Sequence, residues 1–182
     1  MRIAFPLLAP ITLVTACVGA PPPPPAAAAA PVPVAPPLPA PTPAPVAPAL
    51  KGDWRDWPLT PGDWVYRQDA RGSIALFGRP GSDAEVTLRC DRAASLLYLS
   101  RRGAVPGNAP MTVRTSSVVR TLATRPTGGT PAYVAVTIAP RDGLLDAMGF
   151  SRGRFVIEQA GMPVLVVPAW AEILRVVEDC RT

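Results

Sequence analysis

Residues 85–100 read EVTLRCDRAASLLYLS, and this stretch indicates the fold class of the chain. It contains two short runs rich in Val, Leu and Thr, 85–90 and 95–100, with Asp91 in the gap between them. Short apolar and β-branched runs bounded by turn residues are typical of β-strands. The stretch also places Cys90 at the end of its first predicted strand, where a covalent tie to another element would be useful.

Working outward, similar runs recur along most of the chain after residue 60, and Gly, Pro, Asp or Asn separates most of them. Further strands are predicted at 64–68, 73–77, 111–115, 118–123, 133–138, 154–159 and 163–167. Hairpins are expected around 78–82 and at 160–161. We therefore expect a mainly β domain, either an antiparallel β-sandwich or a small barrel.

Two short helices are expected beside these strands, at about 142–149 and 169–180. The first begins at a capping Asp142 and should stop at Gly149 in a left-handed conformation. The second has Pro168 near its start. Its predicted apolar stripe comprises Trp170, Ile173, Leu174, Val177 and Cys180.

The chain has three cysteines, Cys17, Cys90 and Cys180. If Cys17 is modified, the other two remain as a pair, and disulfides persist in oxidising compartments. A zinc site is the alternative, but two cysteines in a chain without histidine make a poor one. We expect a Cys90–Cys180 disulfide that fixes the last helix to the strand ending at Cys90, with no metal and no cofactor.

The N-terminus, MRIAFPLLAPITLVTACVGA, has one basic residue, an apolar run and small residues around a cysteine. This order is typical of a secretory signal peptide. The tetrad Val14-Thr15-Ala16-Cys17 resembles the lipobox of bacterial lipoproteins. That resemblance implies cleavage after residue 16, a lipid on Cys17 and a membrane-anchored protein in the periplasm. The alternative is a signal peptide cut nearby, which leaves Cys17 as a free thiol.

Residues 21–50 are almost entirely Pro, Ala and Val, so the segment 17–50 is interpreted as a disordered, Pro/Ala-rich tether. Such a density of proline favours polyproline II, which rises ~3.1 Å per residue and acts as a semi-rigid spacer. The composition becomes that of a globular domain at residue 51. One domain is expected over 51–182. Because Val18 follows the cysteine where an inner-membrane protein would carry Asp, resemblance to known sorting signals implies the outer membrane.

The formal charge is +5, but the basic residues are scattered rather than gathered into blocks. Nucleic acid is therefore not expected as a partner. An envelope protein or an anionic polysaccharide is the expected kind of ligand, because guanidinium groups suit oxyanions.

Residues 149–153 read GFSRG, which matches the G-x-S-x-G elbow of serine hydrolases. Serine needs a base to become a nucleophile, and this chain has no histidine. Lys51, the one lysine, lies at the start of the domain. The motif also falls between a predicted helix and a strand, the reverse of the elbow's order. Ser151 is therefore not assigned a catalytic role, and no catalytic residue is expected.

Carboxylates, arginines and tryptophans supply the other candidate sites. Asp142 with Asp146, and Glu178 with Asp179, are weighed as acid pairs for glycan chemistry, but helix capping and ion pairing are the favoured explanation. For an anionic ligand the candidates are Arg152, Arg154, Arg101 and Arg102. Solvated strand faces and internal ion pairs are the plainer explanation for these arginines. The tryptophans Trp54, Trp57 and Trp64 have two interpretations, a surface that stacks on sugar rings or a lid over the core. We favour the lid.

Two families resemble the domain. The invasion-associated locus B family is similar over about 64–182, including the terminal segment EILRVVEDCR, and implies a β-sandwich with an accessory envelope role. The C-type lysozyme inhibitor lipoproteins carry a Ser-Gly-x-x-Tyr loop, which Ser151 to Phe155 resembles loosely, with Arg after Ser and Phe in place of Tyr. The whole chain is also similar to uncharacterised Ala/Pro-rich lipoproteins of alphaproteobacteria.

These observations lead to one main hypothesis: a non-catalytic envelope lipoprotein that presents a binding or scaffolding domain on a polyproline spacer. An inhibitor or sequestering module that uses the basic loop 151–155 is the alternative. A carboxylate-dependent enzyme acting on glycans is the third.

Overall fold

A computed structural model of the chain describes residues 19, 50–105, 107 and 109–182. The lipobox, Cys17 and nearly all of the predicted tether lie outside the described residues. No helix in the described ranges is long and apolar enough to cross a membrane. The predicted strands and helices of the domain all lie within these ranges.

The larger of two antiparallel sheets has six strands in the order β1-β2-β3-β4-β8-β7. Their bounds are β1 Asp63–Asp69, β2 Gly72–Gly78, β3 Val86–Asp91, β4 Leu96–Arg102, β7 Arg125–Pro126 and β8 Tyr133–Ile138. The opening stretch of the sequence forms β3 and β4, whose register places Leu88 opposite Leu99. These two strands lie at the centre of the sheet, so both of their edges are hydrogen-bonded.

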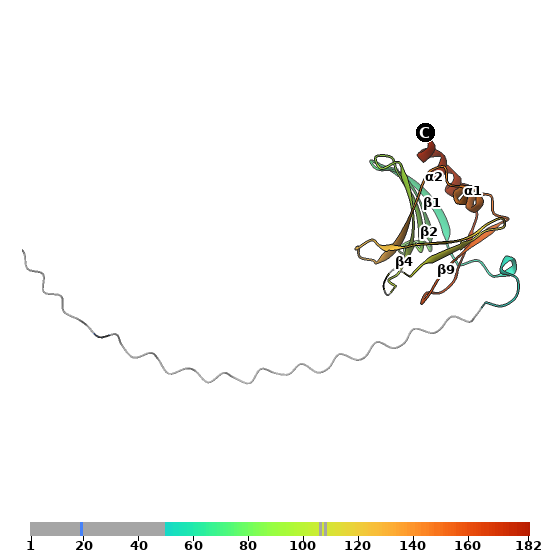
Figure 1. Ribbon diagram of the computed structural model, residues 1–182, viewed down its shortest axis with the longest axis horizontal. Helices are drawn as coiled ribbons and strands as arrows, with labels where there is room; N and C mark the ends of the chain where they lie inside the picture. Colours follow the sequence, from blue (N-terminus) through green and yellow to red (C-terminus); the bar gives the residue numbers. More distant parts are fainter. Residues whose placement is uncertain (1–18, 20–49, 106, 108) are drawn as a thin grey trace, which may run out of the picture. The chain divides into compact units, whose positions relative to one another are not determined.

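The smaller sheet has four strands in the order β10-β9-β5-β6. Its strands are β5 Met111–Arg114, β6 Val119–Leu122, β9 Arg154–Gln159 and β10 Leu165–Pro168. The strands of the two sheets cross steeply in Figure 1, and the helices lie in the space between them. The pairings of the described strands keep the two sheets separate, which confirms the sandwich and not the barrel.

The core consists of the inward-facing side chains of both sheets and the apolar sides of the helices. Alternate residues of a strand face the same side, so β3 buries Val86, Leu88 and Cys90 while Thr87 and Arg89 face outward. The Trp64 ring packs against Phe77, with ring centroids 5.4 Å apart, and its indole Nε1 donates to the carbonyl of Pro168, 2.9 Å away. That hydrogen bond joins the larger sheet to the smaller one.

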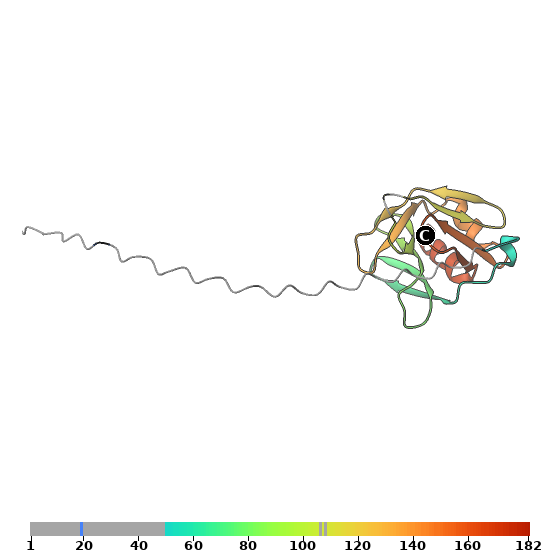
Figure 2. The same cartoon turned by 90° about the horizontal axis from the view of Figure 1, so that it is seen from below.

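The helices α1 (Gly143–Gly149) and α2 (Ala171–Arg181) pack on each other, and α2 also contacts β1 to β4. In Figure 2 they lie in the middle of the domain, with strands around them. Cys180 of α2 forms a disulfide with Cys90 of β3, and the two Cα atoms are 5.4 Å apart. The predicted covalent tie between the last helix and this strand is confirmed.

Three details differ from the sequence predictions. Pro168 ends β10, where it is opposite Arg154, so α2 begins at Ala171 rather than near the proline. Trp170 is 44% exposed and does not join the buried stripe of α2, which uses Val176 instead. The two-residue strand β7 has no apolar pattern of its own and forms because it pairs with β8.

Gly149 also has a different role from the predicted one. It is the last residue of α1, and its φ lies outside the left-handed region. A Cβ atom there would lie 2.3 Å from Cδ2 of Leu174. Glycine is therefore required because α2 approaches α1 closely, and not because the helix ends in a left-handed turn.

Candidate functional site

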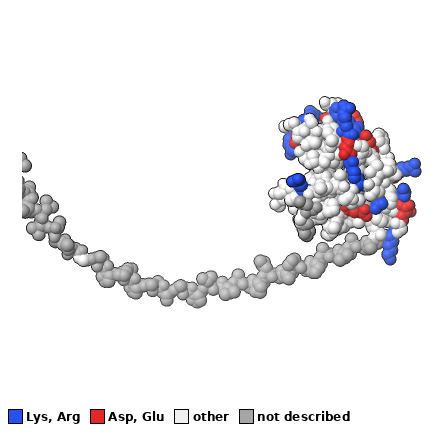
Figure 3. Space-filling model, viewed as in Figure 1, with Lys and Arg blue, Asp and Glu red and all other residues white. Residues whose placement is uncertain are grey.

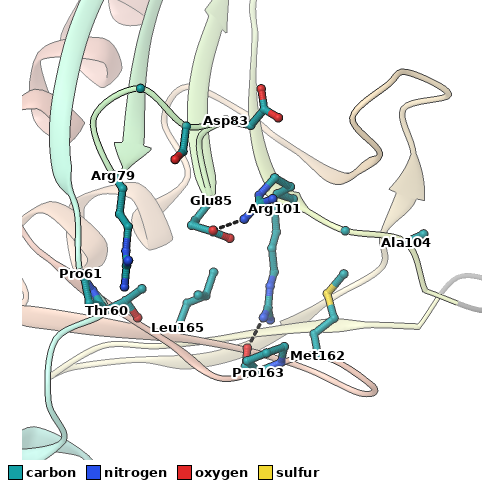
Figure 4. Close-up of a pocket in the computed structure, with 14 residues that line it drawn as sticks. Thr60, Pro61, Arg79, Asp83, Glu85, Arg101, Ala104, Met162, Pro163 and Leu165 are labelled. Atoms are coloured by element: carbon teal, nitrogen blue, oxygen red, sulfur yellow. Dashed lines mark hydrogen bonds and ion pairs between the residues drawn. The ribbon is translucent and has the colours of Figure 1, made fainter. Parts of the chain in front are cut away.

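The main hollow of the domain lies where the ends of β2, β3 and β4 approach the β9–β10 hairpin of the other sheet (Figure 4). Its volume is about 1110 Å³. The lining residues come from the segment before β1, the β2–β3 loop, the end of β4 and the β9–β10 turn: Thr60, Pro61, Arg79, Gly81, Ser82, Asp83, Glu85, Arg101, Arg102, Gly103, Ala104, Met162, Pro163 and Leu165. We call this hollow the Arg101 pocket.

Arg101 is the unusual residue of this pocket because it occupies a core position. It is the third inward-facing residue of β4 after Leu97 and Leu99, and only 2% of it is exposed. Its Nη2 donates to the carbonyl oxygen of Pro163. Its Nε and Nη1 are buried and have no hydrogen-bond partner among the described residues. Since Nε carries one hydrogen and Nη1 two, three N–H donors are unused.

Burial lowers the pKa of the Arg101 guanidinium to about 10, while the negative charge of Glu85 acts in the opposite direction. The group is therefore still protonated at neutral pH. A buried cation without a paired anion is costly, and native proteins normally pair or hydrogen-bond such groups. An oxyanion that displaced the groups covering Nε and Nη1 would therefore meet three unused donors on Arg101.

The two other arginines of the pocket, Arg79 and Arg102, differ in whether they form an ion pair. Arg102 points to the opposite side of β4 and donates through Nη2 to Glu85, and that hydrogen bond raises the pKa of Arg102. Arg79 forms no ion pair within the described ranges, and its side chain extends toward the same hairpin as Arg101 in Figure 4. Of the three arginines that line the pocket, Arg79 and Arg101 therefore have no carboxylate partner among the described residues.

Apolar side chains form the floor beneath these arginines. In Figure 4, Leu165 and Met162 lie on either side of the Arg101 side chain, and Pro61 lies beyond Leu165. Met162 packs closely against the chain at Gly103, where a Cβ atom would lie 2.1 Å from its terminal methyl. The pocket thus combines unused cationic donors with an apolar surface.

The predicted anion site around Gly153 is built differently from the expectation. In an extended chain, Arg152 and Arg154 would point to one face, but Gly153 between them has φ +76°, so the chain is not extended there. Arg152 is exposed, whereas Arg154 donates through Nη1 to the carbonyl oxygen of Trp57. Four arginines were predicted as candidates, and the structure brings only Arg101 and Arg102 to the pocket.

Ser151, the central residue of the GFSRG motif, is 6% exposed and holds two backbone segments together. Its hydroxyl accepts from the backbone N–H of Ser116 at 3.0 Å and donates to the carbonyl of Arg154. The motif therefore anchors the loop before β9, and Gly153 provides the left-handed turn into that strand.

The candidate acids are engaged in structural contacts. Asp142 caps α1 by accepting from the N–H of Leu144 at 2.8 Å and also pairs with Arg120 at 2.6 Å. Asp146 pairs with Arg181 at 2.8 Å. Asp179 accepts from the hydroxyl of Tyr66 at 2.6 Å. Glu178 pairs with Arg181 at 3.0 Å, one helical turn away.

The three tryptophans do not form one exposed surface. Trp64 is 5% exposed and belongs to the core. Trp54 and Trp57 are half-buried at the short 3-10 helix η1, Trp54–Asp56. The indole of Trp57 donates to the carbonyl of Lys51 at 3.0 Å.

A second hollow, of about 410 Å³, lies on the outer face of the larger sheet around Tyr98. Its two arginines are already paired, Arg71 with Asp91 and Arg89 with Asp69, each at 2.7 Å. On the face shown in Figure 3, basic and acidic side chains are likewise interspersed. The Arg101 pocket is therefore the stronger candidate site.

Fold and site together define a two-sheet β domain with a disulfide-fixed C-terminal helix and a pocket beside a buried arginine that has no carboxylate partner within the described ranges. No protein-family model, curated protein or solved structure matches this chain.

Arg101 was a candidate because it is adjacent to Arg102 in the sequence. That adjacency does not indicate that Arg101 is buried. The alternation of β4 was more informative, because Leu97 and Leu99 imply that Arg101 also faces inward. Arg79, Met162 and Leu165 were missed. They come from three separate segments, and nothing in their local sequence shows that those segments meet.

Proposed function

We propose that this protein is a non-catalytic, tethered lipoprotein of the cell envelope whose domain binds an anionic ligand in the Arg101 pocket.

 The single observation that carries this proposal is the buried Arg101 guanidinium, whose Nε and Nη1 have no partner among the described residues. An oxyanion in the pocket would satisfy these donors and neutralise the buried charge.

Two further observations support a binding role rather than catalysis. The acids weighed as a catalytic pair, Asp142 and Asp146, are each occupied by an arginine, and Asp142 also caps a helix. Ser151 is buried, and its hydroxyl is used in two hydrogen bonds to the backbone. Nε and Nη1 of Arg101, by contrast, have no hydrogen-bond partner in the part of the chain that the structure describes.

Anion binding at Arg101 is expected to be visible in the full chain by NMR. We expect the Nε–H signal of Arg101 to shift in a saturable manner as inorganic phosphate or acetate is added at constant ionic strength. The backbone N–H signal of Met162, in the turn beside Arg101, should shift in parallel. Arg101→Met should abolish the shift at Met162, because it keeps an unbranched apolar stem and removes the charge. The variant should still fold, since replacing a buried charge by an apolar group of similar size is often neutral or stabilising.

The matched control is Arg152→Met, which removes the same charge from an exposed position. It should leave the response of the Arg101 signal unchanged. If neither anion shifts the Arg101 signal of the folded wild-type chain, the proposed function is wrong.

The lipid anchor is tested separately, because it depends on Val14-Thr15-Ala16-Cys17 and lies outside the described residues. Cells producing the full chain should incorporate labelled palmitate into the protein, and Cys17→Ser should abolish the label. The same substitution at Cys90 removes a disulfide partner but leaves the lipobox intact, so labelling should persist. Palmitate incorporation that survives Cys17→Ser would refute the anchor and leave the binding proposal standing.

A further inference from the structure

We infer that the ligand of the Arg101 pocket is a monocarboxylate carried on an apolar body, such as a short acyl chain or the C-terminus of an apolar peptide. This inference rests on the proposed function, because it names the class of anion that the same pocket takes. Three properties of the pocket lead to it: its charge, its floor and its size.

The charge of the pocket matches a single negative charge. Its lining includes three arginines, Arg79, Arg101 and Arg102, and two carboxylates, Asp83 and Glu85, which leaves one net positive charge. Arg102 is already paired with Glu85. A phosphate dianion beside Arg101 would bring a second negative charge close to Glu85, whereas a carboxylate would not. The planar guanidinium also suits the planar carboxylate group.

The floor of the pocket favours a ligand with an apolar part. The Arg101 side chain lies between Leu165 and Met162, so an apolar segment attached to an anion at Arg101 would have these two side chains beside it (Figure 4). Free phosphate or sulfate would gain nothing from this surface. A hydrocarbon segment would bury it, and each buried methylene contributes about 0.8 kcal/mol to transfer from water, which corresponds to roughly fourfold in affinity.

The size of the pocket points to the same class of ligand. Its volume of about 1110 Å³ far exceeds the space that a single small ion fills. Ligand pockets of roughly 300–1,000 Å³ typically hold molecules of drug-like size, with an apolar lining and a few polar groups that fix orientation. The carboxylate at Arg101 is therefore the orienting group of a larger molecule.

Calorimetric titration of the full chain with acetate, butyrate, hexanoate and octanoate tests the inference. We expect Kd to fall by about fourfold for each methylene that the pocket buries, and hexanoate to bind more tightly than inorganic phosphate. A second series of N-acetylated dipeptides that end in Ala, Val or Leu tests the peptide source. A rise in affinity with apolar size in either series supports the shared chemistry.

Two variants separate the charged and apolar contributions. Arg101→Met should weaken hexanoate binding by about tenfold or more, as expected for loss of a charge-assisted hydrogen bond. Met162→Gln keeps a side chain of similar length. It should reduce the dependence of Kd on the length of the acyl chain and leave the Kd of acetate unchanged. Arg152→Met serves again as the exposed control, with no change in either series.

The outcomes distinguish this inference from the proposed function. Suppose that phosphate and acetate shift the Arg101 signal, but that all chain lengths bind with the same affinity or phosphate binds best. The inferred ligand class is then wrong, and the proposed anion site remains supported. If no anion of either series, and no phosphate, binds through Arg101, the proposed function itself is wrong.

Discussion

Replacement of both Cys90 and Cys180 by alanine should lower the free energy of unfolding by about 4–5 kcal/mol, because it removes a cross-link that closes a long loop. The two residues are separated by 90 positions, so the bond restricts much of the unfolded chain of the domain. For a domain of this size the loss corresponds to a melting temperature lower by more than about 10 °C. Thermal and urea unfolding of the full chain, monitored by circular dichroism, measure the effect.

Reduction provides the control for this experiment. A reductant should destabilise the wild-type chain by a similar amount and should leave the double alanine variant unchanged. Both cysteines have to be replaced together, because a single substitution leaves a free thiol beside the core, where Cys90 is fully buried. Equal unfolding midpoints for the wild type and the double variant would contradict the assigned role of the disulfide.

Phe77→Ala is expected to cost about 3–5 kcal/mol, the usual range for truncating a buried aromatic ring. Phe77 lies on β2 with no exposed surface, and its ring packs against Trp64, which joins the two sheets through its hydrogen bond to Pro168. The substitution would leave a cavity at the point where the sheets meet. Urea unfolding should show a lower midpoint with an unchanged slope, since the surface exposed on unfolding hardly changes.

Val65→Ala is the matched control for this substitution. Val65 lies on β1, the strand paired with β2, but it is 46% exposed and faces away from the core. Its truncation should cost less than about 1 kcal/mol, as is usual for surface substitutions. If Phe77→Ala were no more costly than Val65→Ala, the two-sheet core would not depend on the contact between Phe77 and Trp64.

Much of the fold could be predicted because strand signals are local. The strands at 133–138 and 154–159 have the predicted bounds, and the first helix begins after the predicted cap Asp142. The errors arise where distant segments decide the outcome. Pro168 is compatible with a helix start by itself, yet it ends a strand because it pairs with Arg154. The strand β7 exists only through its pairing with β8.

The candidate site could be predicted much less well, because its properties depend on distances between groups remote in sequence. Every arginine of the chain is a plausible anion ligand when it is considered alone. Arg114, Arg120 and Arg181 turned out to have carboxylates within 4 Å, and Arg154 a backbone carbonyl. Arg101 differs from these because it is 2% exposed and its Nε and Nη1 have no hydrogen-bond partner among the described residues.

The sequence by itself determined the β-rich class, the disulfide and the shortage of bases that argues against a serine nucleophile at Ser151. These follow from short-range pattern and from composition, since strand alternation, cysteine number and the lack of histidine are properties of the chain alone. Only the tertiary structure decided that Arg101 is buried and has no carboxylate partner among the residues that the structure describes. Burial and pairing are set by which segments meet across the two sheets, and no local pattern specifies that meeting.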